Sequence, residues 1–133
     1  MQDLSAWNVL IVDDEPDNRG VLEFVLGSYK ATVHAVETGQ EFLKLLERER
    51  PTVLLIDIQM PGMSGIELLA KIHERPEWRK IPAIAITAYA MSGDQERILA
   101  AGFDGYVAKP LNVMRLIDDL GKMIADKWEQ NGR

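Results

Sequence analysis

The chain has 133 residues, a length typical of one domain that folds without disulfides or a structural metal. It contains no cysteine, which excludes disulfides, thiolate nucleophiles and cysteine-ligated zinc. A net charge of -6 without a long basic run argues against a nucleic-acid-binding domain, and no apolar stretch reaches membrane-spanning length. Because the N-terminus also lacks the pattern of a signal peptide, we expect a cytoplasmic protein with no nucleic-acid or membrane partner.

The first part of the chain alternates apolar strands with amphipathic helices. The run 8–12 predicts a buried strand, and Pro16 suits the first turn of the helix that follows. We expect a short strand over 31–35, and a second helix that begins at Thr38-Gly39 and ends before Pro51. The residues expected to face inward are Leu22, Val25, Leu26 and Tyr29 in the first helix, and Phe42, Leu45 and Leu46 in the second.

The stretch 52–57 is the expected centre of the sheet. Its apolar residues are typical of a strand buried on both faces, and it ends in Asp57 before a loop rich in proline and glycine. An ionised carboxylate at the end of a buried strand is unfavourable unless a cation or hydrogen-bond donors meet it. The groups that surround Asp57 should therefore reveal the function.

The second part of the chain continues the alternation. We expect a helix after Gly65, a polar loop over 74–80, a strand over 82–87, a helix from a Ser92–Gln95 capping box to near Gly102, a strand over 104–108, a final helix, and a frayed tail over 129–133. The expected inward residues are Ile66, Leu69 and Ile72 after Gly65, and Val113, Leu116, Ile117, Leu120, Ile124 and Trp128 in the final helix.

Five strand–helix units in alternation predict an α/β fold, a doubly wound parallel five-stranded sheet with helices on both faces. We expect a single domain over 1–133 with an ordered core of about 7–128. In such sheets the working site lies outside the C-terminal ends of the strands.

Polar residues stand at four of these five strand ends. Asp13 and Asp14 follow the first strand, Asp57 ends the third, Thr87 the fourth, and Lys109 follows the fifth. Three neighbouring carboxylates require a cation, and oxygen ligands without histidine or cysteine favour Mg²⁺, or Mn²⁺, over zinc. An ammonium and a hydroxyl can bind phosphoryl oxygens, so Asp57 is a candidate nucleophile toward phosphorus.

These residues lie in four motifs, Val12-Asp13-Asp14-Glu15, the stretch 57–65, Thr87-Ala88 and Lys109-Pro110. In this order they make the chain resemble the receiver domain of two-component response regulators over essentially its whole length. The resemblance implies a flavodoxin-like (βα)5 fold with strand order 2-1-3-4-5. It also implies a protein that catalyses only its own phosphorylation and dephosphorylation.

The resemblance assigns a role to each site residue. Asp57 would accept a phosphoryl group from a histidine kinase or a histidine phosphotransfer protein, and Thr87 and Lys109 would contact that group. The Lys109–Pro110 peptide bond would be cis. The Mg²⁺ ligands would be Asp14, Asp57 and the backbone carbonyl of Gln59, with Asp13 acting through a water.

The resemblance also implies how the signal leaves the domain. Thr87 and Tyr106 would form the switch, and Gln59 and Tyr89 would tune the lifetime of the phosphorylated state. We hypothesise that the bulk of Tyr89 shields the acyl phosphate from water. No output domain follows the last helix, so the chain would be a single-domain regulator or a receiver cut from a longer hybrid kinase. In either case an effector protein would bind the face formed by the fourth helix, the fifth strand and the last helix. The protein would be a monomer or a phosphorylation-dependent dimer.

Plainer interpretations stay open. The run Asp13-Asp14-Glu15 could cap the first helix, and we assign Glu15 to such a cap rather than to the ligands. His34 and His73 lack partners at ligand spacing and are interpreted as structural or solvated. Two other functions are a constitutive interaction module and a phosphatase resembling the haloacid dehalogenases. The interaction module is disfavoured because none of the acids of the site has been lost. The phosphatase is disfavoured by the order of the aspartates in the chain.

Overall fold

The computed structural model describes residues 3–88 and 92–131. Five strands form one parallel sheet in the order β2-β1-β3-β4-β5, which confirms the predicted fold class and strand order. The elements in chain order are β1 (Asn8–Val12), α1 (Pro16–Ser28), β2 (Thr32–Val36), α2 (Gly39–Arg48), β3 (Val53–Asp57), α3 (Gly65–Ile72), the 3-10 helix η1 (Pro76–Trp78), β4 (Ala83–Thr87), α4 (Ser92–Ala100), β5 (Gly105–Ala108) and α5 (Val113–Gln130).

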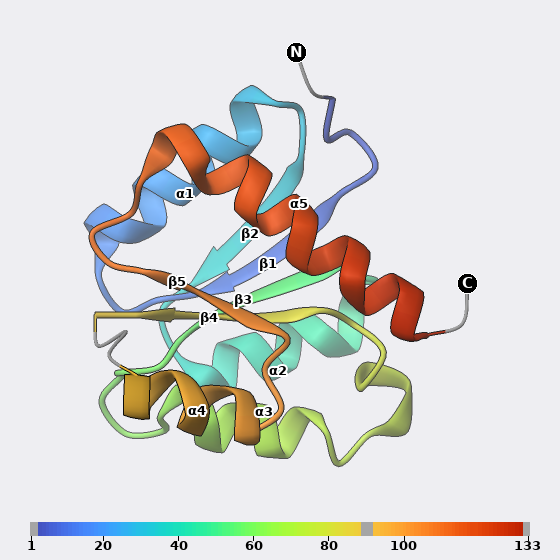
Figure 1. Cartoon of the computed structure of the whole chain (residues 1–133). Coiled ribbons are helices and arrows are strands. Elements are labelled where there is room, and N and C mark those ends of the chain that lie inside the picture. Colours follow the sequence, from blue (N-terminus) through green and yellow to red (C-terminus); the bar gives the residue numbers. More distant parts are fainter. Residues whose placement is uncertain (1–2, 89–91, 132–133) are drawn as a thin grey trace.

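Helices cover both faces of the sheet, α1 and α5 on one side and α2, α3 and α4 on the other (Figure 1). Successive strand residues point to opposite faces, so each central strand contributes to both cores. In β1, Val9 and Ile11 pack under α1 and α5, whereas Leu10 and Val12 pack under the other three helices. Every residue of β3 and β4 is buried, as expected for strands covered on both sides.

The inward faces of the helices follow the predicted spacing, with one residue omitted in α3 and one wrongly placed in α5. In α3, Leu69 and Ile72 are fully buried and Ile66 is half-buried against the same core, as predicted. The prediction omitted Leu68, which is also fully buried. Val113 was expected inside but is 45% exposed, because the first turn of α5 borders a shallow hollow beside α1. The predicted fraying does not begin at residue 129, since α5 continues to Gln130 and the Asn131 side chain donates to the Lys80 carbonyl oxygen at 2.9 Å. The last two residues of the predicted tail lie outside the described residues.

Local signals explain where the helices begin. Thr38 with Glu41, and Ser64 with Glu67, form capping boxes that satisfy the free amides of α2 and α3. These two boxes follow a readable sequence pattern that the prediction overlooked. Helix α4 does begin at Ser92, as expected, although the Ser92 side chain of the predicted capping box lies outside the described residues. Among the described residues, no helix combines the length and apolar character needed to cross a membrane.

Candidate functional site

The parallel register brings the polar strand ends to one edge of the sheet. Val12 of β1 pairs with Ile56 of β3, and Asp57 pairs with Ile86 of β4. Thr87 in turn pairs with Ala108 of β5. The residues that follow these pairs therefore meet at the C-terminal edge, where α/β folds of this type carry their sites.

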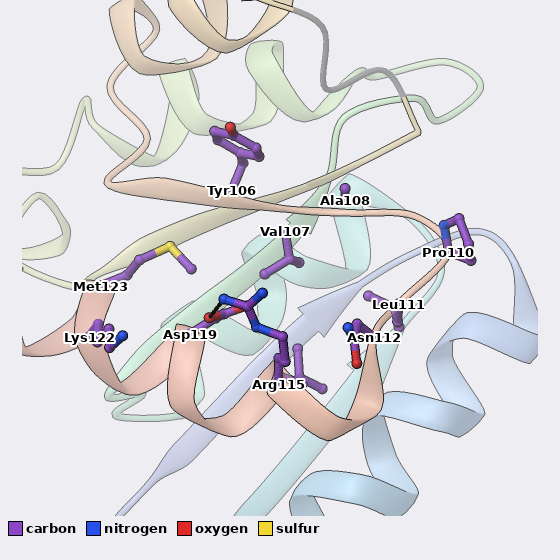
Figure 2. Close-up of a pocket in the computed structure, with 11 residues that line it drawn as sticks. Tyr106, Val107, Ala108, Pro110, Leu111, Asn112, Arg115, Asp119, Lys122 and Met123 are labelled. Carbon is purple, nitrogen blue, oxygen red and sulfur yellow. Dashed lines mark ion pairs between the residues drawn. The ribbon is translucent and has the colours of Figure 1, made fainter.

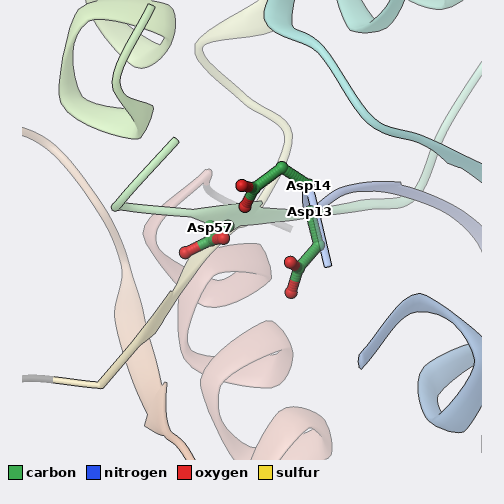
Figure 3. A group of neighbouring side chains, drawn as sticks. All are labelled: Asp13, Asp14 and Asp57. Atoms are coloured by element: carbon green, nitrogen blue, oxygen red, sulfur yellow. The ribbon is translucent and has the colours of Figure 1, made fainter. Parts of the chain in front are cut away.

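Three carboxylates form the centre of the site (Figure 3). Asp13, Asp14 and Asp57 each offer an oxygen, and these oxygens all lie within 4.8 Å of one another. Asp13 and Asp57 are fully buried, and Asp14 is half-buried. Backbone amides satisfy one oxygen of each buried acid: Glu15 N donates to Asp13 Oδ1 at 2.9 Å, and Gln59 N donates to Asp57 Oδ1 at 3.1 Å.

The remaining oxygens fit a hard cation. Asp13 Oδ2 is buried and has no hydrogen-bond partner among the described residues, and the Lys109 ammonium 3.5 Å away is shared with two other carboxylates. A buried carboxylate oxygen that is compensated only in part is suited to a further cation. Every ligand in the cluster is a carboxylate oxygen, the donor type preferred by Mg²⁺ and Mn²⁺. The acidic triad is therefore suited to hold a divalent metal ion.

The crowding changes the acidity of Asp57. Burial, reinforced by the neighbouring charge of Asp13, raises the pKa of Asp57 to about 7 despite the opposing charge of Lys109. Both causes disfavour the ionised carboxylate. Any cation that enters the cluster will therefore favour the ionised form, which is the form able to act as a nucleophile.

Lys109 reaches the same edge from the end of β5. Its Nζ lies 2.8 Å from Glu15 Oε1, 3.3 Å from Asp57 Oδ2 and 3.5 Å from Asp13 Oδ2. Burial of the ammonium acts to lower its pKa, but the hydrogen bond to Glu15 and the three carboxylate charges together raise the pKa of Lys109 above its ordinary value. The backbone N–H of Lys109 donates to the Thr87 carbonyl oxygen at 2.8 Å, and the Lys109–Pro110 peptide bond is cis.

The expected switch residues lie on neighbouring strands. Thr87 is 1% exposed at the end of β4, and Tyr106 is half-buried on β5. Figure 2 shows the Tyr106 side chain on the opposite side of β5 from α5, and it packs against the core beneath α2, α3 and α4. Gln59 is exposed, whereas Tyr89 lies outside the described residues.

A hollow of about 460 Å³ lies between β5 and α5 (Figure 2). Its walls include Val107 and Pro110 from the β5 side, and Arg115 and Met123 from α5. Arg115 pairs with Asp119, one turn further along α5, at 3.8 Å. The hollow therefore adjoins the end of β5 that carries Lys109.

Glu15 corrects one sequence prediction. It does occupy the N-cap position of α1, but among the described residues its side chain makes no capping hydrogen bond. Its Oε1 instead accepts from Asn18 Nδ2 at 2.9 Å and from Lys109 Nζ at 2.8 Å. No short-range pattern could have revealed the second contact, since its partners lie 94 positions apart.

Arg19 supports the loop that carries two acids of the cluster, whereas both histidines lie outside the cluster. Arg19 Nη1 donates to the Asp13 carbonyl oxygen at 2.7 Å and so supports the loop after β1, a contact that the prediction missed. Neither histidine belongs to the acidic cluster. His34 Nε2 lies 3.3 Å from Glu49 Oε1, and His73 caps the end of α3, where burial lowers its pKa.

Comparisons with known proteins agree with this geometry. A family model described as "Response regulator receiver domain" matches residues 9–121. The chain is 43% identical over 117 residues to an uncharacterised 14.6 kDa protein of Leptolyngbya boryana, a match covering 88% of this chain and 89% of that protein. It is 35% identical over 119 residues to the polar-differentiation response regulator DivK of Brucella anthropi, covering 90% and 97% of the two chains.

One similar solved structure is the receiver domain of the sensor histidine kinase PA1611 from Pseudomonas aeruginosa, described with a magnesium ion coordinated in its active-site cleft. It superposes with a TM-score of 0.80 at 34% identity, covering 90% of this chain and 98% of that one. The similarity thus extends over nearly the whole of both chains.

Proposed function

This chain belongs to the response regulator receiver domain family, and we propose that Asp57 accepts a phosphoryl group from the phosphohistidine of a histidine kinase or a histidine phosphotransfer protein. As a receiver domain, the protein is a signalling module of two-component systems rather than a conventional enzyme. The observation that carries the proposal is the buried Asp57 carboxylate, close to two other acids and 3.3 Å from the Lys109 ammonium.

The proposed reaction is an in-line displacement at phosphorus. An Asp57 carboxylate oxygen forms the new P–O bond of an acyl phosphate while the P–N bond of the phosphohistidine breaks. The electron pair of that bond returns to the imidazole, which leaves neutral because its other ring nitrogen carries a proton. Lys109 and Thr87 stabilise the phosphoryl oxygens by their charge and hydroxyl, so catalysis consists mainly of positioning and charge stabilisation.

The acidic triad is the proposed magnesium site. Asp14, Asp57 and the backbone carbonyl of Gln59 would hold the ion, and Asp13 would act through a water. When bound, Mg²⁺ neutralises charge on the phosphoryl oxygens, and Mn²⁺ can take its place. The lack of a hydrogen-bond partner for the buried Asp13 Oδ2 within the described part of the chain supports this assignment, as does the magnesium named for the Pseudomonas receiver.

Output is proposed to follow a population shift. Phosphorylation would favour the conformation in which Thr87 contacts the phosphoryl group and Tyr106 turns further inward, because only that state gains the new contacts. The effector would then bind the face formed by α4, β5 and α5, which includes the hollow beside Val107 and Met123. We expect a monomer, or a dimer that forms on phosphorylation.

The decisive experiment is intact-mass spectrometry after incubation with acetyl phosphate. We expect one phosphoryl adduct that requires Mg²⁺, persists in the control variant Asp17→Asn, and is lost in Asp57→Asn. No adduct even after a fast quench would contradict the proposal and favour a constitutive interaction module. Repeated turnover of a phosphoester without an adduct would instead favour a phosphatase.

A further inference from the structure

We propose that Glu15 is a positioning residue that holds the Lys109 ammonium while Asp57 is unphosphorylated and releases it to an arriving phosphoryl group. The proposal rests on the function proposed above. It gives a role to a residue that is adjacent to the acidic triad in the sequence but is not one of its carboxylates.

The first support for this role comes from the distances between the Lys109 ammonium and its three carboxylate partners. The shortest of the three carboxylate contacts of the ammonium is to Glu15, at 2.8 Å, and the contacts to Asp57 and Asp13 are 0.5 and 0.7 Å longer, by subtraction from 3.3 and 3.5 Å. Asn18, one helical turn further along α1, donates to the same Glu15 oxygen at 2.9 Å. The receiving carboxylate is thus itself held in place, and it joins the start of α1 to the end of β5.

The second support is the difference in burial between Glu15 and the other two carboxylate partners of Lys109. Asp13 and Asp57 are fully buried and would be left with uncompensated charge if Lys109 moved away without a replacement cation. The Glu15 side chain is 59% exposed, so water can solvate it as soon as the ammonium leaves. Glu15 is therefore the partner that can release Lys109 at the lowest cost.

Charge gives the exchange its direction. A phosphoryl group on Asp57 carries close to two negative charges and several acceptor oxygens, whereas Glu15 offers one charge screened by solvent. Lys109 should therefore leave Glu15 when the acyl phosphate forms. Before that moment the Glu15 contact competes with the incoming group for the same ammonium, which slows phosphorylation.

The resting contact can be tested without any phosphorylation. We would record the ammonium resonances of the lysine side chains by ¹⁵N NMR and assign Lys109 by its loss in Lys109→Met. We expect the Lys109 resonance to shift in Glu15→Gln, to move back toward the wild-type position in Glu15→Asp, and to stay in place in Asp17→Asn. An unchanged Lys109 resonance in Glu15→Gln would overturn the proposal.

The competition can be tested by kinetics with acetyl phosphate and Mg²⁺, in which a P–O bond of the donor breaks and acetate leaves. From the usual worth of a partly exposed ion pair, we expect Glu15→Gln to be phosphorylated about two- to fivefold faster than wild type. Asp17→Asn should be phosphorylated at the wild-type rate, because it removes a nearby negative charge but leaves the Glu15–Lys109 ion pair intact.

A double-variant comparison separates this role from simple repulsion of the anionic donor. In a Lys109→Met background the Glu15→Gln change should have no further effect on the rate. The same acceleration in that background, or no acceleration in the single variant, would overturn the proposal. If the wild-type protein accepts no phosphoryl group at all, the proposed function fails, and the NMR comparison alone still decides whether Glu15 holds Lys109.

Discussion

Asp57 is fully buried beside a second fully buried carboxylate, that of Asp13. Such a pair opposes folding when both groups are ionised, because burial and mutual repulsion act in the same direction. The positive charge of Lys109 offsets this repulsion only in part, since it is shared among three carboxylates. Asp57, the proposed phosphoacceptor, is therefore also a residue that reduces the stability of the protein when no cation compensates its charge.

This conflict predicts the effect of Asp57→Asn on stability without divalent cations. The folded-state pKa of Asp57 is about 7, above the ordinary value of 3.8, so the folded protein retains a proton between these pH values that the unfolded chain has lost. Stability should therefore decrease as the pH rises from about 4 to about 7. At pH 8 we expect Asp57→Asn to be more stable than wild type by about 2–4 kcal/mol.

Urea denaturation in EDTA across this pH range measures the effect. The advantage of Asp57→Asn should shrink toward zero as the pH falls below about 4, where the wild-type carboxyl becomes protonated in both states. Saturating MgCl₂ at pH 8 should stabilise the wild-type protein and reduce its difference in stability from Asp57→Asn, because the bound cation compensates the charge of the ionised carboxylates. A difference in stability that is independent of pH would show that burial of the Asp57 charge is not its cause.

At the scale of elements, the turn from β3 into α3 decides where the Gln59 backbone lies. Gly65 begins α3, and its N–H donates to the Ile58 carbonyl oxygen at 3.0 Å, which closes the loop tightly. A Cβ atom at this position would overlap the Asp57 carbonyl oxygen and lie 2.9 Å from Ile58 Cα. Because both obstacles are backbone atoms, they cannot move aside independently.

We therefore expect Gly65→Ala to lower the free energy of unfolding by about 1–3 kcal/mol, the usual cost of overpacking. It should also slow phosphorylation of Asp57, since the loop that carries the proposed Gln59 ligand must shift. The matched control is Gly121→Ala in α5, where a Cβ meets no atom within 4 Å. That change should raise stability by about 0.5–1 kcal/mol in the same urea titrations. Equal stability of Gly65→Ala and wild type would contradict the steric argument.

At the scale of the whole molecule, one sheet couples two hydrophobic cores. The core beneath α2, α3 and α4 includes Trp78 at its edge, and the core beneath α1 and α5 includes Trp7 and Trp128. Alternate residues of the same central strands enter both cores, so neither core can be dismantled while the sheet stays intact. The two faces should unfold together.

Tryptophan fluorescence can test this coupling. One variant would keep only Trp78 (Trp7→Phe, Trp128→Phe), and a second would keep only Trp128 (Trp7→Phe, Trp78→Phe). Within each variant we expect the urea midpoint from fluorescence to coincide with that from far-UV circular dichroism, as in two-state unfolding. Midpoints that differ in either variant would show that one face of the sheet opens before the other.

The sequence by itself determined the order and type of the elements, because apolar periodicity, glycine and proline act over a few neighbouring residues. The predicted strands agree with the structure to within one residue at their ends, and the fold places Asp13, Asp14, Asp57 and Lys109 together as the parallel topology requires. The prediction of inward helix residues was wrong at Val113 and omitted Leu68, because both positions depend on how a helix packs against its neighbours.

Only the tertiary structure decided which groups share one ammonium. Glu15 follows Asp14 directly in the chain, yet its oxygen accepts a hydrogen bond from Lys109, whereas Asp13 Oδ2 meets the same ammonium only at 3.5 Å. Such choices depend on the register between strands and on the direction in which each side chain leaves the backbone. Neither quantity is encoded by neighbours in the chain, because both arise only when crossover connections bring distant strand ends to one edge.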